Sequence, residues 1–355
     1  MRWKQSAALL AAAVFLWSGC AGEQNLAQQA HEATTFAMDT IMTFTIYDED
    51  GEHLLIDAEQ EVRRLERLFS VTMEDSEIAR LNQNAGVTSI SISQDTAALL
   101  QAGKEISAWT GGCYDMTVSP IVKAWGFTEE EHRVPTQEEL DTLLPLVDSG
   151  GVILSETEQT AYLTKAGMAV DLGGIAKGYT SDAVTKLLRD SGVTSALIYL
   201  GGNISTLGTK PDGTLWKIAV ENPLDATDYV GLMEVSDCSV ITSGGYQRYF
   251  EQDGKRYHHI IDPSNGYPAE SGLLSVTIIS ENGTKADGLS TALFVMGLED
   301  AMEFWRQNEG FEAIFVTEDG RVVATEGIAQ QFTFEGRDND FEYEIAERAE
   351  EGASV

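Results

Sequence analysis

The sequence is poor in cysteine, in basic residues and in long apolar runs. Three cysteines in 355 residues are too few for a disulfide framework. The 23 Lys and Arg residues stand against 57 Asp and Glu residues, which gives a formal net charge of −34. Because a surface this acidic repels nucleic acid and no basic stripe interrupts it, we expect no nucleic-acid partner. Hydrophobic residues make up 43% of the chain, ample for one large core or two smaller ones.

The clearest apolar run lies at the N-terminus and is too short to span a bilayer. Arg2 and Lys4 precede apolar residues 7–17, and Ser18-Gly19-Cys20 follows them. This order is typical of a signal peptide. A Cys directly after two small residues resembles a bacterial lipobox, although Trp17 stands where such boxes usually carry Leu.

We therefore expect residues 1–19 to be a lipoprotein signal peptide and Cys20 to carry the lipid. The polar residues 20–33 would then tether a domain to the extracytoplasmic face of the cell membrane. Ordinary secretion with cleavage nearby is the alternative.

A stretch in the middle of the chain places two charged residues around a glycine turn. Apolar residues 168–172 predict a short buried strand, and the apolar spacing from Ile175 to Leu188 predicts a helix. Such a connection points free backbone N–H groups and the positive end of a helix dipole at an anion. Asp171 and Lys177 flank the turn. Taken alone, a tight strand-to-helix connection is the simpler interpretation, because neither the Rossmann nor the P-loop spacing is present.

Other predicted strands end in similar residues. Glycine-rich ends recur at Gly201-Gly202-Asn203 and at Ser243-Gly244-Gly245, which favours a shared binding crevice over independent turns. Asp253-Gly254 predicts a hairpin that leads to His258 and His259. Because successive strand residues face opposite sides, only one of these histidines can point into a given crevice. Thr35 to Tyr47 alternates well enough to predict one strand.

A predicted helix over residues 286–296 carries Asp287 and Thr291 four positions apart, on one face. An aspartate and a hydroxyl with backbone carbonyls nearby suit a hard cation such as Mg²⁺. The alternative is that Asp287 caps the helix and Thr291 packs.

Several separated motifs occur in the order that one known family carries them. They are Met38-Asp39-Thr40, Ser76-Glu77-Ile78, Tyr114-Asp115, Asp171 to Gly178, Gly201-Gly202-Asn203, Thr242-Ser243-Gly244, His259 to Pro263, and Asp287 with Thr291. From about residue 35 to 320 the chain resembles the ApbE family, the FAD:protein FMN transferases. The resemblance implies an α+β fold of mostly antiparallel sheets with packed helices, related to the T-fold. We expect this domain to span residues 34–335 and an acidic tail to occupy residues 336–355.

Members of this family bind FAD with Mg²⁺, cut its pyrophosphate and pass FMN to a Ser or Thr hydroxyl of a target protein, releasing AMP. The acceptors are typically extracytoplasmic flavoprotein subunits of membrane electron-transfer complexes, which a lipid anchor at Cys20 would bring within reach. The resemblance thus implies FAD as substrate, Mg²⁺ as cofactor and a flavoprotein as partner.

The resemblance also assigns roles to residues. Positions that correspond to FAD contacts are Met38, Cys113, Tyr114, Asp115, Asp171, Lys177 and Ile261. Gly174, Asp287 and Thr291 correspond to the metal site. Gly174 can contribute only its backbone carbonyl, so Gly174→Ala should be tolerated. His259 corresponds to the residue that helps deprotonate the acceptor hydroxyl, and its ordinary pKa of about 6.5 suits that role.

One position departs from the family pattern. Thr72-Met73 stands where transferases often carry a Tyr in the flavin pocket. An unfilled position there could admit water to the pyrophosphate and favour hydrolysis. A metal-dependent FAD pyrophosphatase is therefore the nearer alternative, and a flavin-binding lipoprotein without chemistry is the other.

Overall fold

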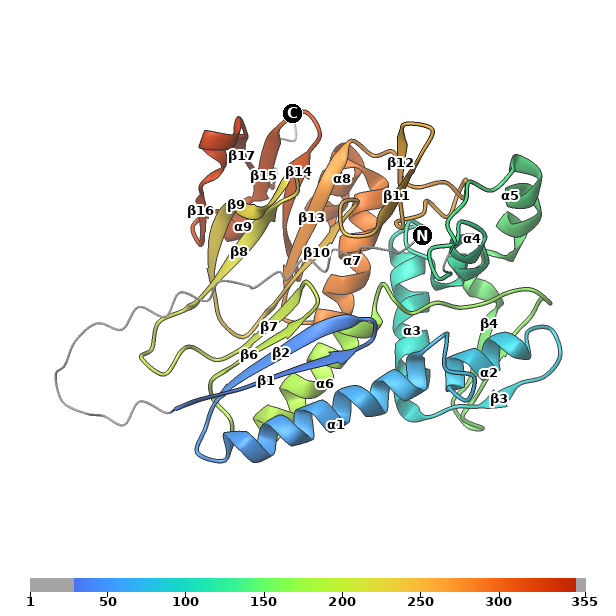
Figure 1. Cartoon of the computed structure of the whole chain (residues 1–355), viewed down its shortest axis with the longest axis horizontal. Helices are drawn as coiled ribbons and strands as arrows, with labels where there is room; N and C mark the ends of the chain where they lie inside the picture. The colour runs from blue at the N-terminus through green and yellow to red at the C-terminus, as the bar shows by residue number, and fades with distance from the viewer. Residues whose placement is uncertain (1–28, 130, 349–355) are drawn as a thin grey trace, which may run out of the picture.

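A nine-stranded sheet forms the centre of the molecule in the computed structural model, which describes residues 29–129 and 131–348 (Figure 1). Neighbouring strands are antiparallel except for β15 and β17, which confirms the α+β class with mostly antiparallel sheets. In spatial order the strands are β1 (Ala30–Ala37), β2 (Thr40–Tyr47), β6 (Ala196–Leu200), β7 (Asn203–Leu207), β10 (Ser239–Gly244), β13 (Leu273–Ser280), β14 (Glu312–Thr317), β15 (Arg321–Thr325) and β17 (Glu342–Ala346).

Three long helices cover one face of this sheet: α1 (Gly51–Phe69), α6 (Ala176–Asp190) and α7 (Gly283–Met296). Leu54, Ala58 and Val62 recur at helical spacing along α1 and are buried against β2 and β6. The other helices are α2 (Glu77–Gln83), α3 (Gln94–Trp109), α4 (Ser119–Ala124), α5 (Gln137–Leu143), α8 (Leu298–Gln307) and α9 (Glu326–Ala329).

A small sheet packs on the opposite face of the large one. It consists of β16 (Phe332–Phe334), β9 (Asp225–Val235) and β8 (Trp216–Asn222). Ile218 and Met233 of this sheet share a core with Val240 and Val316 of the large sheet. A further sheet, β3 (Ile90–Ser91), β5 (Thr160–Leu163) and β4 (Val152–Ser155), lies beside α2 and α3, and β11 (Tyr249–Gln252) with β12 (Lys255–His258) forms the predicted hairpin.

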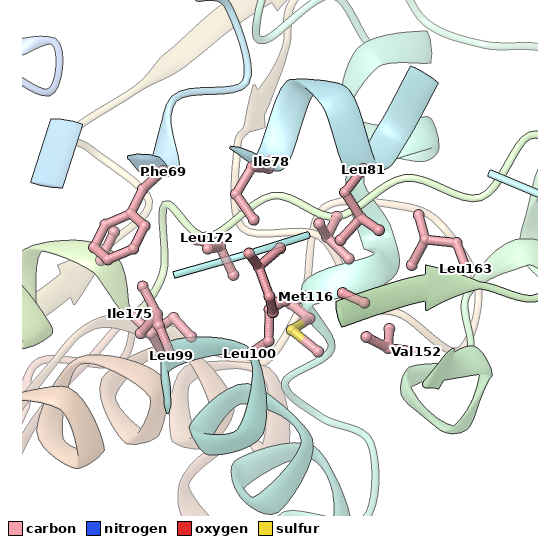
Figure 2. Packing of buried hydrophobic residues seen from close by; sticks show 14 of the residues in the cluster. Phe69, Ile78, Leu81, Leu99, Leu100, Met116, Val152, Leu163, Leu172 and Ile175 are labelled. Carbon is pink, nitrogen blue, oxygen red and sulfur yellow. The ribbon is translucent and has the colours of Figure 1, made fainter. Parts of the chain in front are cut away.

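The glycine turn before α6 is fixed by its apolar neighbours. Figure 2 shows Leu172 and Ile175 among the buried side chains of α2, α3 and the sheet formed by β3, β5 and β4. Both residues are almost completely buried, with 1% and 0% of their surface exposed. Burying the residue on each side of Gly173-Gly174 leaves the turn little freedom to move.

The predicted strand from Thr35 to Tyr47 is instead a hairpin. Met38 and Asp39 form its turn, and both adopt left-handed backbone conformations with φ of 47° and 59°. Met is rare in this conformation and a single Asp is a weak turn signal, so the pattern does not mark the turn. The hairpin also begins at Ala30, so residues 30–33, expected as part of the tether, belong to the sheet.

Residues 168–172 belong to no strand of the described chain, contrary to the prediction, although Met168, Val170 and Leu172 are buried. The Asn82 side chain takes the place of a neighbouring strand: its Oδ1 accepts the Val170 N–H at 2.8 Å, and its Nδ2 donates to the Val170 carbonyl at 2.9 Å. The Asp171 N–H donates to the Met116 carbonyl at 2.8 Å. The backbone is therefore satisfied without a sheet.

The C-terminal part of the described chain departs from the predicted domain bounds. Within the expected acidic tail, residues 342–346 form β17 at the edge of the large sheet, so this part of the tail is integral to the fold. None of the helices in residues 29–129 and 131–348 is long and apolar enough to cross a membrane. The expected signal peptide and Cys20 lie outside the described residues.

Candidate active site

Asp287 stands at the closest approach of α6 and α7. Its carboxylate is 3% exposed, and Oδ2 accepts the Gly178 backbone N–H at 2.8 Å. A side chain at Gly178 would collide with α7, since its Cβ would lie 2.2 Å from the Gly283 carbonyl oxygen. One oxygen of Asp287 is thus held by the backbone of α6. The other oxygen, Oδ1, makes no hydrogen bond within residues 29–129 and 131–348 and remains available to a ligand.

Thr291 and Gly174 lie beside Asp287. Thr291 follows one helical turn later on α7, and a Cβ built on Gly174 would lie 3.6 Å from its Oγ1. The structure therefore brings together the three residues predicted for the metal. A carboxylate, a hydroxyl and a backbone carbonyl are hard oxygen donors that fit Mg²⁺.

The donor set is small, however. Among the residues that the structure describes, no three His, Cys, Asp or Glu side chains are placed to hold a metal together. A cation at Asp287 would have to complete its shell with water or with oxygens of a substrate. Mg²⁺ is commonly bound in this way, through one or two carboxylates and substrate phosphates.

The glycine turn supplies an anion-binding surface next to these donors. Asp171 Oδ1 accepts the Gly173 N–H at 2.7 Å, and the Lys177 ammonium lies 3.5 Å from the Gly173 carbonyl oxygen. Among the described residues, no side chain caps the start of α6. The positive end of this helix and the Lys177 charge therefore favour a phosphate at the turn.

The loop before α4 places Tyr114 against the turn. A Cβ on Gly174 would lie 3.0 Å from Tyr114 Cε2. The Tyr114 hydroxyl is buried without a hydrogen-bond partner in the described residues. Burial and then the charges of Asp287, Asp171 and Asp115 raise its pKa well above the usual value, so the phenol stays neutral.

Asp115 holds this loop in place. Its Oδ1 accepts the Thr117 N–H at 2.8 Å and the Thr117 hydroxyl at 2.5 Å, and its Oδ2 accepts the Ser149 N–H at 3.1 Å. The Asp115 carboxylate thus ties the loop that carries Tyr114 to Thr117 and Ser149.

Met38 and Cys113 pack against the apolar cluster that contains Leu172, Ile175 and Tyr114, whereas Ile261 lies in a separate cluster. The Met38 N–H donates to Glu66 Oε1 at 2.6 Å, and the Thr180 hydroxyl lies 3.6 Å from its sulfur. Cys113 is a half-buried free thiol whose pKa is raised by burial and then by Asp262 and Asp300. Ile261 is buried in the aromatic cluster around Trp125.

His259 follows β12 with a defined tautomer. Its Nδ1 lies 3.2 Å from the Arg248 carbonyl oxygen. Since a carbonyl only accepts, Nδ1 carries the proton of the neutral ring and Nε2 keeps its lone pair. Burial, followed by the charges of Arg248, His258 and Lys177, lowers the pKa of His259 to about 3. The ring is therefore neutral at pH 7, with an unprotonated Nε2.

His258 has a different role, as the alternation along the strand predicts. Its Nε2 lies 3.1 Å from the Ala269 carbonyl, and its ring packs edge-on against Phe294 at 5.4 Å. His258 thus belongs to the core beneath the hairpin.

Two functional contacts were not predicted from the sequence. Arg248 forms an ion pair with Asp39 at 3.0 Å, so the same residue holds the Met38-Asp39 turn and, through its carbonyl, the ring of His259. Ser243 contacts both Ser290 and Thr291 on α7. Asp39 and Ser243 both fall inside motifs that the sequence displays, but their partners lie far away in the chain.

These features define a class: an α+β protein whose site suits a phosphate-bearing substrate and a hard cation, with a neutral histidine held by a nearby hairpin. The chain belongs to the ApbE family, whose sequence model matches residues 38–315. This match confirms the resemblance to the ApbE family that the sequence motifs indicate.

Relatives whose names state an activity are similar to this chain over most of their length. The chain is 39% identical over 265 residues to the FAD:protein FMN transferase of Klebsiella pneumoniae, covering 74% of this chain and 82% of the relative. It is 36% identical over 284 residues to the enzyme of the same name from Treponema pallidum, covering 76% and 78%. The crystal structure of the ApbE protein from Thermotoga maritima superposes with a TM-score of 0.80 at 32% identity, covering 85% of this chain and 99% of that one. The flavinyl transferase ApbE of Pseudomonas stutzeri gives a TM-score of 0.76 at 30% identity, covering 86% and 97%.

Proposed function

We propose that this protein transfers FMN from FAD to a Ser or Thr hydroxyl of a flavoprotein, with Mg²⁺ as the metal and AMP as the leaving group. The family and the names of the relatives support flavin transfer. The bond that forms joins the FMN phosphorus to the acceptor oxygen, and the bond that breaks is the phosphoanhydride to AMP. The hydroxyl proton leaves the acceptor, and the electron pair of the broken bond goes to AMP.

The chain offers a group for each demand of phosphoryl transfer. Asp287, Thr291 and the Gly174 carbonyl would hold Mg²⁺, which supplies charge neutralisation at the pyrophosphate. Lys177 and the start of α6 would bind non-bridging oxygens. The lone pair at His259 Nε2 can take the hydroxyl proton.

The observation that carries this proposal is the position of Asp287. A carboxylate buried beside a phosphate-binding turn would repel an anionic substrate unless a cation lay between them. Its free Oδ1, with Thr291 one turn away, provides that cation site next to the anion site.

AMP release tests the proposal. Purified protein is incubated with FAD and Mg²⁺, with and without an acceptor flavoprotein domain. A transferase releases AMP only when the acceptor is present, and chelation of Mg²⁺ or Asp287→Asn abolishes the release. AMP and free FMN formed equally without acceptor would instead identify an FAD pyrophosphatase. Intact FAD throughout, at every metal concentration, would identify a flavin-binding protein.

We also propose that the protein works at the extracytoplasmic face of the cell membrane, anchored by a lipid on Cys20. The order of basic, apolar and small residues before Cys20 supports this. Its acceptors would be flavoprotein subunits of membrane electron-transfer complexes on the same face. Cys20→Ser should release the protein from the membrane fraction, and retention of this variant would contradict the anchor.

A further inference from the structure

Ser243 is the last residue but one of β10, the strand that runs alongside α7 (Figure 1). Its hydroxyl lies 2.7 Å from Ser290 Oγ and 3.4 Å from Thr291 Oγ1. Ser290 Oγ lies in turn 2.8 Å from the Asp287 carbonyl oxygen. A row of three hydroxyls therefore connects the backbone of Asp287 to the side chain of Thr291.

The direction of each hydrogen bond in this row follows from the number of protons. A hydroxyl has one proton to donate and lone pairs to accept, whereas a carbonyl only accepts. Ser290 therefore donates its one proton to the Asp287 carbonyl. The proton between Ser243 and Ser290 then comes from Ser243. Ser243 has none left, so the proton between it and Thr291 comes from Thr291.

This direction decides where the Thr291 lone pairs point. A threonine in a helix commonly donates to the carbonyl four residues earlier. For Thr291 that carbonyl belongs to Asp287, which already accepts from the Ser290 hydroxyl and, within the α-helix, from the Thr291 N–H. With its proton toward Ser243, Thr291 Oγ1 keeps its lone pairs free on its other sides, including the side of Gly174.

We propose that Ser243 is a positioning residue of the cation site: it accepts the Thr291 proton and so turns the Thr291 lone pairs toward the cation. The inference rests on the proposed function only for the identity of that cation as Mg²⁺. The Ser243 to Thr291 contact is long for an O–H···O bond. A hydroxyl that ligates a cation is a stronger donor, so this contact and the bound cation reinforce each other.

Mn²⁺ binding, followed by electron paramagnetic resonance without any acceptor, tests this role. Ser243→Ala leaves the Thr291 proton without its acceptor, so Mn²⁺ binding should weaken about tenfold, which corresponds to ~1.4 kcal/mol. Ser243→Thr keeps the hydroxyl and should bind Mn²⁺ like the native protein. Ser290→Ala should give a smaller loss, because Ser243 is then free either to donate to Thr291 or to accept from it.

Ser239→Ala is the matched control. Ser239 lies on the same strand, and its hydroxyl also pairs with another serine at 2.7 Å, that of Ser205. This variant should keep native Mn²⁺ affinity. Native affinity in Ser243→Ala, within twofold, would overturn the proposal, as would an equal loss in Ser239→Ala. Since no FAD or acceptor is needed, failure of flavin transfer with the Mn²⁺ effect intact would refute the proposed function alone.

Discussion

At the scale of single residues, the state of His259 determines what it can do. Its Nδ1–H is held by the Arg248 carbonyl, and burial and neighbouring positive charges lower its pKa to about 3. A ring in this state is neutral at pH 7, and its Nε2 is unprotonated. It is not a cation that could bind the pyrophosphate by charge.

His259→Ala should therefore lower flavin transfer and leave FAD binding nearly intact. Loss of a general base typically costs about 10²- to 10⁴-fold in rate. Acceptor labelling by mass spectrometry gives the rate, and flavin fluorescence gives the affinity for FAD. A parallel loss of FAD affinity would make His259 a binding residue instead.

The lowered pKa also predicts the acid side of the pH profile. A base whose pKa is lowered stays deprotonated as the pH falls through its ordinary value of about 6.5. The rate at low FAD concentration, which reports the free enzyme, should therefore show no His259 protonation step near pH 6.5. A step at that pH which disappears in His259→Ala would contradict the local electrostatics described here.

At the scale of elements, replacing a glycine by alanine should have different effects in the turn before α6 and at the crossing of α6 with α7. Gly174→Ala puts a Cβ 3.0 Å from a ring atom of Tyr114, which needs to yield by a few tenths of an ångström. Gly178→Ala puts one 2.2 Å from a backbone oxygen of α7, which cannot yield without moving the helix.

We expect Gly174→Ala to keep Mg²⁺-dependent activity and Gly178→Ala to lose both stability and activity. Overpacking of this kind costs about 1–3 kcal/mol, and the helix shift would also move Asp287 away from the turn. Urea unfolding followed by circular dichroism measures the stability of both variants. Equal stability of the two variants would show that α6 and α7 have room for a side chain at Gly178. A folded but inactive Gly174→Ala would count against the Gly174 carbonyl as a metal ligand.

Much of the element structure could be predicted from local patterns. The helix from Ala176, the Asp253-Gly254 hairpin and the pairing of Asp287 with Thr291 on one helical face follow from spacing and turn residues alone. The Met38-Asp39 turn could not, because Met is rare in the left-handed region and a single Asp is a weak turn signal.

Contacts between distant segments were also beyond local patterns. Asn82 replaces a strand partner for Val170, 88 residues away. The hydroxyl row depends on Ser243 meeting Ser290, 47 residues away. In both cases the residue type is visible in the sequence, but its partner is set by how the sheet and helices pack.

At the scale of the whole molecule, the fold collects segments from most of the chain around one turn. Met38 comes from the first hairpin, Tyr114 from the loop before α4, His259 from the last part of the β11–β12 hairpin and Asp287 from α7. The site thus draws on residues from Met38 to Thr291, and no single hairpin or helix carries all its donors.

The intact mass of an acceptor flavoprotein domain, after incubation with the protein, FAD and Mg²⁺, tests the central claim most directly. We predict that the acceptor gains one FMN on a Ser or Thr and that one AMP appears for each. Replacing that acceptor residue by Ala, or using Asp287→Asn, should abolish the gain. An unmodified acceptor beside free FMN and AMP would contradict the transferase assignment.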